Sequence, residues 1–90
     1  MPRVASPAAA HIGRLIAAER MRVAVTQDQL AAASGIDSSN IRAYEGGRAM
    51  PNLHSLLRIA DALGVEVGAL LIGVTLEMFP VSPSDGRRRG

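Results

Sequence analysis

The 90-residue sequence contains no cysteine and no lysine, and its only aromatic residues are Tyr44 and Phe79. Without cysteine there is no disulfide framework, no thiolate zinc site and no cysteine nucleophile. The missing lysine excludes a P-loop and Schiff-base chemistry, because both require an amine at a defined position. With so few aromatic residues, we expect the core to be aliphatic.

Long apolar stretches are also missing, since no run approaches the roughly 18 residues of a membrane span. The start of the chain faintly resembles a signal peptide, but His11 and Arg14 interrupt its apolar run. We therefore expect a cytoplasmic protein. The length and the 48% hydrophobic content indicate one small globular domain, and a formal net charge of +2 gives no strong field toward nucleic acid.

Candidate catalytic and metal-binding groups are sparse. His11 and His54 are far apart, with no acidic cluster at ligand spacing, so each is more typical of a helix surface than of a metal site. The serines have no His and Asp partners nearby. The sequence predicts no enzyme, no cofactor and no metal.

Helix-capping signals divide the chain into five short helices. Hydroxyl, carboxylate and amide side chains precede the expected helices, and glycines follow most of them. The predicted helices span residues 8–22, 27–34, 38–45, 53–63 and 66–71. In the fourth helix, spacings of three and four predict a core-facing stripe of Leu53, Leu56, Leu57, Ala60 and Leu63. The predicted fold class is all-α, with a compact domain over residues 8–72 after a flexible segment, residues 1–7.

The chain changes character after Gly73. Val74, Leu76 and Met78 alternate with polar residues as far as Phe79, which predicts a short strand or an extended arm. Residues 82–90 are polar and basic, which predicts disorder. Arg87, Arg88 and Arg89 would either follow a DNA backbone or belong to a solvated tail, and the sequence leaves both open.

Residues 26–45 combine a short capped helix, a tight glycine turn and a second helix. The apolar residues of this stretch, Leu30, Ile36, Ile41 and Tyr44, fall at positions that point into the domain. Between them the outward positions of the second helix hold Ser38, Ser39, Asn40, Arg42 and Ala43. This combination is typical of a helix-turn-helix motif.

The stretch 12–71 resembles the Cro/C1-type (Xre-like) helix-turn-helix family of phage repressors and bacterial regulators. The matches run in register and include Thr26-Gln27, Leu30-Ala31, Gly35-Ile36, Tyr44-Glu45, Pro51 and Ala62-Leu63-Gly64-Val65. The resemblance implies a five-helix lambda-repressor-like domain. Two departures are Ala24, where the family usually has glycine, and Gly46, where it usually has a polar residue.

The resemblance also implies roles for individual residues. Gln27 would hold a DNA phosphate and brace the second helix of the motif, and Arg20 and Glu45 would form an internal salt bridge. Positions that face base edges hold Ser38, Ser39 and Ala43, with Asn40 and Arg42 beside them. Arg48 and Asn52 would form a second backbone clamp. Short side chains at the base-reading positions predict sparse direct readout. Contact with thymine methyl groups, Arg42 and DNA shape would then supply more of the specificity.

These expectations lead to a sequence-specific DNA-binding transcriptional regulator. We expect a repressor that binds double-stranded DNA as a homodimer on a near-palindromic operator, with Val74, Leu76, Met78 and Phe79 in the dimer contact. The alternative is an antitoxin-like or adaptor module whose C-terminal arm, residues 73–90, binds a partner protein.

Overall fold

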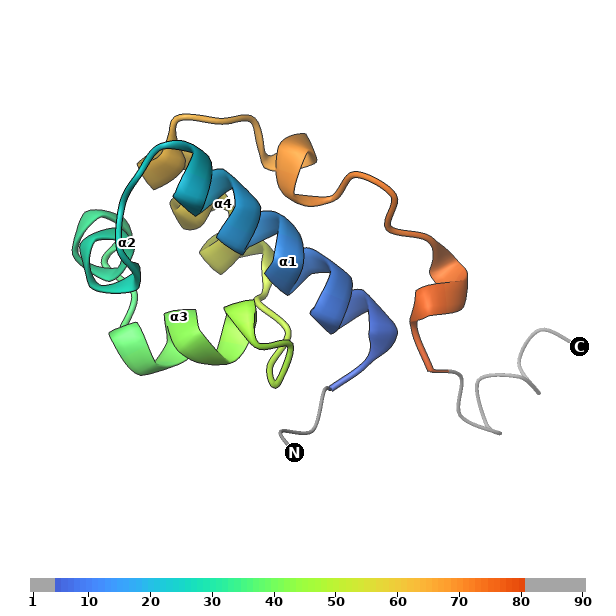
Figure 1. Cartoon of the computed structure of the whole chain (residues 1–90). Coiled ribbons are helices and arrows are strands. Elements are labelled where there is room, and N and C mark those ends of the chain that lie inside the picture. Colours follow the sequence, from blue (N-terminus) through green and yellow to red (C-terminus); the bar gives the residue numbers. More distant parts are fainter. Residues whose placement is uncertain (1–4, 81–90) are drawn as a thin grey trace, which may run out of the picture.

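The computed structural model describes residues 5–80 of the chain. Its elements are α1 (Pro7–Arg22), α2 (Gln27–Ser34), α3 (Ser38–Glu45) and α4 (Leu53–Leu63), followed by two 3-10 turns, η1 (Val67–Leu70) and η2 (Leu76–Met78). In Figure 1, α1 crosses in front of α4, α2 lies at one end and α3 lies below. The all-α prediction is confirmed for the described residues, which contain no strand.

The helix boundaries follow the capping signals of the sequence. At the start of α2, the Thr26 hydroxyl accepts the Gln29 N–H at 3.0 Å, and the Gln29 side chain accepts the Thr26 N–H at 2.8 Å. This reciprocal pair is a capping box, which satisfies two backbone donors that the helix leaves free. Asn52 caps α4 in a similar way, by accepting the Ser55 N–H at 2.8 Å. Local side chains therefore decide where these helices begin.

An aliphatic core joins all four α-helices to η1, as the composition predicted. Each fully buried side chain of this kind stabilises the fold by about 1.5–3 kcal/mol relative to an exposed one. The core consists of Ile12, Ile16, Leu30, Ala31, Ile36, Ile41, Leu56, Ile59, Ala60, Leu63 and Leu70.

Two predictions about the C-terminal end of the domain differ from the structure. The predicted fifth helix, residues 66–71, is the single 3-10 turn η1, because the segment is short and contains Gly68, a weak helix former. The predicted strand or arm instead forms the turn η2, between extended residues Thr75 and Phe79. Within the segment expected to be flexible, the Ala5 N–H donates to the Gly47 carbonyl at 2.7 Å, and the Ser6 hydroxyl caps α1.

The predicted stripe on α4 is wrong at two positions. Leu53 is 65% exposed and Leu57 is also exposed, whereas Ile59, which lay outside the stripe, is fully buried. Successive residues turn about 100° around a helix axis, so Leu56 and Leu57 cannot both face a narrow core. The two leucines instead form an apolar patch on the surface of α4.

No helix within residues 5–80 combines the length and the apolar character needed to cross a membrane.

Candidate nucleic-acid interface

The turn between α2 and α3 sets the angle between the two helices. Gly35 has φ +72°, a left-handed conformation that glycine adopts without steric cost. The N–H groups of Gly35 and Ile36 both donate to the Ala31 carbonyl, at 2.9 and 3.2 Å. Because Ile36 is buried, this turn is anchored to the core and α3 cannot swing freely.

Arg58 of α4 caps the C-terminal end of α2. Its Nε donates to the Ser34 carbonyl at 2.8 Å, and its Nη2 donates to the Gly35 carbonyl at 3.1 Å. A cation at this end of a helix also interacts favourably with the helix dipole. The guanidinium covers Gly35 so closely that an added Cβ would collide with Nη2. Sequence analysis missed this contact, since the two partners are 24 residues apart and no local pattern links them.

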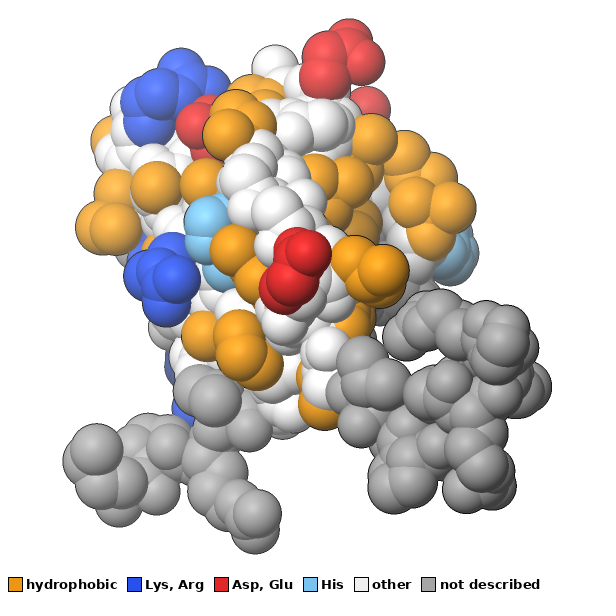
Figure 2. All heavy atoms as spheres, turned by 90° about the vertical axis from the view of Figure 1, so that its right-hand side faces the viewer, with side chains coloured by type: hydrophobic (Ala, Val, Ile, Leu, Met, Phe, Trp, Pro, Cys, Tyr) orange, Lys and Arg blue, Asp and Glu red, His pale blue; other side chains and the backbone are white. Residues whose placement is uncertain are grey.

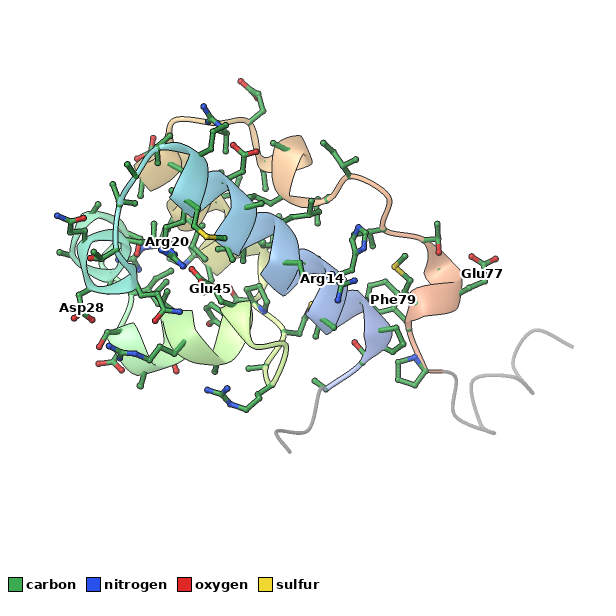
Figure 3. The ribbon with its side chains drawn as sticks, in the orientation of Figure 1. Arg14, Arg20, Asp28, Glu45, Glu77 and Phe79 are labelled. Carbon is green, nitrogen blue, oxygen red and sulfur yellow. The ribbon has the colours of Figure 1, made fainter. Side chains whose placement is uncertain are left out.

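A polar network ties α1, α2 and α3 together, and Figure 3 shows Arg20 and Glu45 directed toward each other. Arg20 Nε lies 2.6 Å from Glu45 Oε2, and Arg20 Nη2 lies 2.9 Å from Glu45 Oε1. Gln27 Nε2 donates to the same Oε1 at 3.0 Å. The two charged side chains are only 16% and 6% exposed, and the hydrogen bonds that Arg20 donates to Glu45 raise the pKa of Arg20 despite its burial. The structure thus joins three of the residues that the resemblance singled out.

Close backbone packing holds α3 against α1. A Cβ added to Gly13 would collide with the Tyr44 carbonyl and would lie 2.8 Å from the Glu45 carbonyl oxygen. Gly13 is therefore the residue that lets the end of α3 approach α1. Gly13 is among the residues that match the resembling family, but no local pattern in the sequence predicts its role, because that role depends on a partner helix.

The outer face of α3 presents short polar side chains to solvent. Ser39 and Asn40 are exposed, and Ser38 and Ala43 are half-buried. The Asp37 carboxylate begins the helix by accepting the Ser39 N–H at 3.0 Å and the Ser39 hydroxyl. These bonds from Ser39 lower the pKa of Asp37, so the carboxylate is ionised at neutral pH. One of the predicted base-reading hydroxyls is therefore engaged in the helix cap.

Arg42 forms an ion pair with a residue that sequence analysis did not consider. Its Nη2 lies 3.0 Å from Oδ1 of Asp28 in the first turn of α2. The pair is open to solvent, with the two side chains 48% and 73% exposed. The structure therefore adds Asp28 to the surface formed by α2 and α3.

The segment between α3 and α4 contains the two residues of the predicted second clamp. Arg48 is exposed, and its guanidinium lies over Gly46, where an added Cβ would come within 2.7 Å of Nη1. Asn52 is exposed too, but its amide oxygen is used in the cap of α4. Both residues remain accessible next to the end of α3.

The residues assigned to a dimer or partner contact divide into two sets. Val74 packs against the core and Met78 is half-buried, whereas Leu76 is 72% exposed and Phe79 is also exposed. In Figure 3, Phe79 lies on the side of η2 toward α1, and Glu77 lies on the outer side. Figure 2 looks onto this part of the molecule and shows hydrophobic side chains in several separate groups among polar atoms.

His11 attaches the chain after η1 to α1, since its Nε2 lies 2.6 Å from the Ile72 carbonyl oxygen. Within residues 5–80 no group of three or more His, Asp and Glu side chains is arranged to hold a metal ion. The predicted basic tail with Arg87, Arg88 and Arg89 lies outside the described residues.

A family model described as a helix-turn-helix domain matches residues 11–71. The chain therefore belongs to the helix-turn-helix domain family, and its similarity to the following regulators supports the resemblance to the Cro/C1-type family. It is 34% identical over 55 residues to the cryptic phage CTXphi transcriptional repressor RstR of Vibrio cholerae serotype O1. That match covers 61% of this chain and 49% of the repressor, so the chain spans about half the repressor's length.

Two solved structures have similar folds. The restriction-modification controller protein C.AhdI from Aeromonas hydrophila is 29% identical, with a TM-score of 0.68 over 69% of this chain and 94% of the other. The clp gene regulator ClgR from C. glutamicum is 26% identical, with a TM-score of 0.69 over 76% of this chain and 94% of the other. Their names describe regulators, not enzymes.

Proposed function

We propose that this protein is a sequence-specific DNA-binding transcriptional regulator that represses as a homodimer on a near-palindromic operator. The observation that supports this most directly is the outward polar face of α3, which packing against α1 and the anchored turn at Gly35 hold in one orientation. A recognition helix needs such a fixed setting to enter the major groove. The names of the three similar proteins, a repressor, a controller protein and a gene regulator, support regulation of transcription.

In this proposal the contacts to DNA come from both sides of α3. The Gln27 amide has two N–H donors, and since one is given to Glu45, the other can bind a phosphate oxygen. Arg48 and the cap of α4 at Asn52 bind the backbone on the other side. Ser38, Ser39, Asn40 and Ala43 then contact base edges, by hydrogen bonds or by packing against thymine methyl groups. The bound protein blocks access to a promoter.

The homodimer proposal rests on the exposed apolar side chains after η1. Leu76 and Phe79 expose surface that a second copy would cover by two-fold symmetry. Two protomers would then contact half-sites about 34–36 Å apart, one turn of DNA.

The same exposed side chains support the second candidate function, an antitoxin-like or adaptor module. A partner protein would then cover the segment around Leu76 and Phe79. Copurification of the protein with the product of a neighbouring gene would favour this candidate, whereas self-association of the pure protein would favour the repressor.

Selection of bound DNA from a random pool by the full chain tests the proposed function. We expect enrichment of one inverted repeat, and on that repeat Arg48→Ala should bind more weakly, with a salt slope reduced by about 1 because a phosphate contact is lost. Arg22→Ala is the matched control, since Arg22 is an exposed arginine on α1 paired with Glu19 at 2.8 Å. A pool that stays random after repeated rounds contradicts the DNA-binding proposal.

A further inference from the structure

We propose that Arg42 reads a guanine in the major groove and that Asp28 positions its guanidinium for that contact. This inference rests on the proposed DNA-binding function and makes Arg42 the main specificity-determining residue of α3. The sequence-based expectation left Arg42 suited to a phosphate or an outer base and counted it among several sources of specificity, whereas the present inference assigns it to a guanine.

The position of Arg42 on α3 is the first step. Residues three and four apart share a helix face, so Arg42 lies on the face of Ser38 and Ser39, one turn along. Helical side chains lean toward the N-terminus, which directs Arg42 toward that end of α3. In a helix-turn-helix motif this end enters the groove. The two serines are short, and they leave the space in front of them open to a long side chain.

The ion pair with Asp28 is the second step. Asp28 belongs to α2, a different element from Arg42, and its Oδ1 fixes Nη2 at 3.0 Å. A guanidinium has five N–H donors, and this contact with Oδ1 uses only one side of the group. The remaining donors form the fork that matches the O6 and N7 acceptors of guanine. The carboxylate therefore orients the arginine without blocking it.

The negative charge of Asp28 favours a contact of Arg42 with a base over a contact of Arg42 with a phosphate. An ion pair this exposed contributes little to folding stability, so stability does not explain it. If Arg42 gripped a phosphate, the Asp28 carboxylate would compete for the same cation and would repel the DNA backbone. A guanine edge is neutral, so the carboxylate can keep its hold on Arg42 and reduce the entropy that a long side chain loses on binding.

The test measures binding of the full chain to the DNA site that it selects from a random pool, by fluorescence anisotropy. Each guanine of the site is replaced in turn by 7-deazaguanine, which lacks the N7 acceptor. We expect one such replacement per half-site to weaken binding by about fivefold or more. Arg42→Ala should lose this sensitivity. Arg42→Lys should lose only part of it at an unchanged salt slope, because lysine can also donate to O6 and N7 but lacks the planar fork.

The variants of Asp28 distinguish positioning from charge alone. Asp28→Asn should lose part of the sensitivity to 7-deazaguanine at an unchanged salt slope, and Asp28→Glu, which keeps the carboxylate, should retain more of it. Arg22→Ala, an exposed arginine on α1, should behave as the parent. Because Asp28 and Arg42 are exposed, we expect the melting temperatures of these variants to match the parent's.

Two results would overturn the inference while leaving DNA binding intact. One is that Asp28→Asn tightens binding to every sequence. The other is that Arg42→Ala lowers the salt slope by about 1 and keeps its sensitivity to 7-deazaguanine. Both identify Arg42 as a phosphate contact. Failure of the parent to select any sequence is a different result, which overturns the proposed function and this inference together.

Discussion

At the scale of single residues, Ala24 has a backbone conformation that L-amino acids rarely adopt. Its φ is +60°, at the junction between α1 and α2 where the resembling family usually has glycine. We expect Ala24→Gly to stabilise the protein by about 1 kcal/mol, because glycine adopts a left-handed conformation without the Cβ clash. Urea unfolding with a fixed m-value measures the change.

The matched control is the same substitution at Ala18, an exposed residue inside α1. Glycine there should destabilise by about 0.5–1 kcal/mol, because it loses more conformational entropy within a helix. A loss of stability in both variants would show that Ala24 is not strained.

Glu45 is the residue on which the polar network between helices depends. Glu45→Ala removes the partner of both Arg20 and Gln27, and leaves the Arg20 charge largely buried. We expect a loss of about 3 kcal/mol, the lower end of the range for breaking a buried pair, because Arg20 retains some contact with solvent. Thermal unfolding is the measurement.

Glu19→Ala is the control for Glu45, since Glu19 pairs with Arg22 on the surface of α1. This exposed pair should contribute at most about 1 kcal/mol. Equal melting temperatures of the Glu45 variant and the parent would mean that the Arg20 pair adds nothing to stability.

At the scale of elements, α2 depends on a contact that comes from α4. Arg58→Ala leaves the carbonyls of Ser34 and Gly35 without their charged donor. We expect a loss of about 1–2 kcal/mol and faster hydrogen exchange of the α2 amides, because hydrogen bonds to charged groups contribute more than neutral ones. Arg14→Ala, an exposed arginine on α1, should change neither quantity. If the amides of α2 exchange hydrogen equally fast in Arg58→Ala and in the parent, Arg58 does not stabilise α2.

The elements also show which features the sequence could predict. Thr26, Gly35, Asp37 and Asn52 act on backbone within a few residues, so the limits of α2, α3 and α4 followed from sequence alone. The segment containing η1 has no cap and only four residues in its turn. There packing decides the conformation, and the expected fifth helix is wrong.

Residues of the candidate site were predictable only in part, because only contacts within a few residues leave a pattern in the sequence. The resemblance led to Gln27, Arg20 and Glu45, and the structure brings these three together. Arg58, Gly13 and Asp28 act on partners 14 to 32 positions away in the chain, and no local spacing predicts these contacts. Spacing on α4 gave the period of the helix but not the width of its buried face, which is why Leu53 and Leu57 were misassigned.

At the scale of the whole molecule, several large apolar side chains of the described residues 5–80 are exposed outside the core. Among them are Leu76 and Phe79 around η2, and Leu53 and Leu57 on α4. In Figure 1 the chain after α4 returns along one side of the molecule, so η2 lies apart from α2 and α3. A dimer contact at η2 would therefore leave the outer face of α3 free for DNA.

We expect the double substitution Leu76→Ser and Phe79→Ser to convert a dimer to a monomer. The same variant should bind a palindromic site about 100-fold more weakly, because the second half-site is no longer engaged within one complex. Sedimentation velocity and anisotropy measure the two effects on the full chain. Thermal unfolding should stay cooperative but occur at a lower temperature, because the dimer contact is lost and Phe79 is only 38% exposed.

The control makes the same chemical change on α4, as Leu53→Ser with Leu57→Ser, and should remain dimeric. If the α4 variant becomes monomeric and the η2 variant does not, the dimer interface lies on α4, where the two leucines belong to the exposed face of the helix. If the parent chain is monomeric even on a palindromic site, Leu76 and Phe79 have another partner. The antitoxin-like or adaptor function would then explain their exposure, because a different protein would cover these side chains instead of a second copy of the chain.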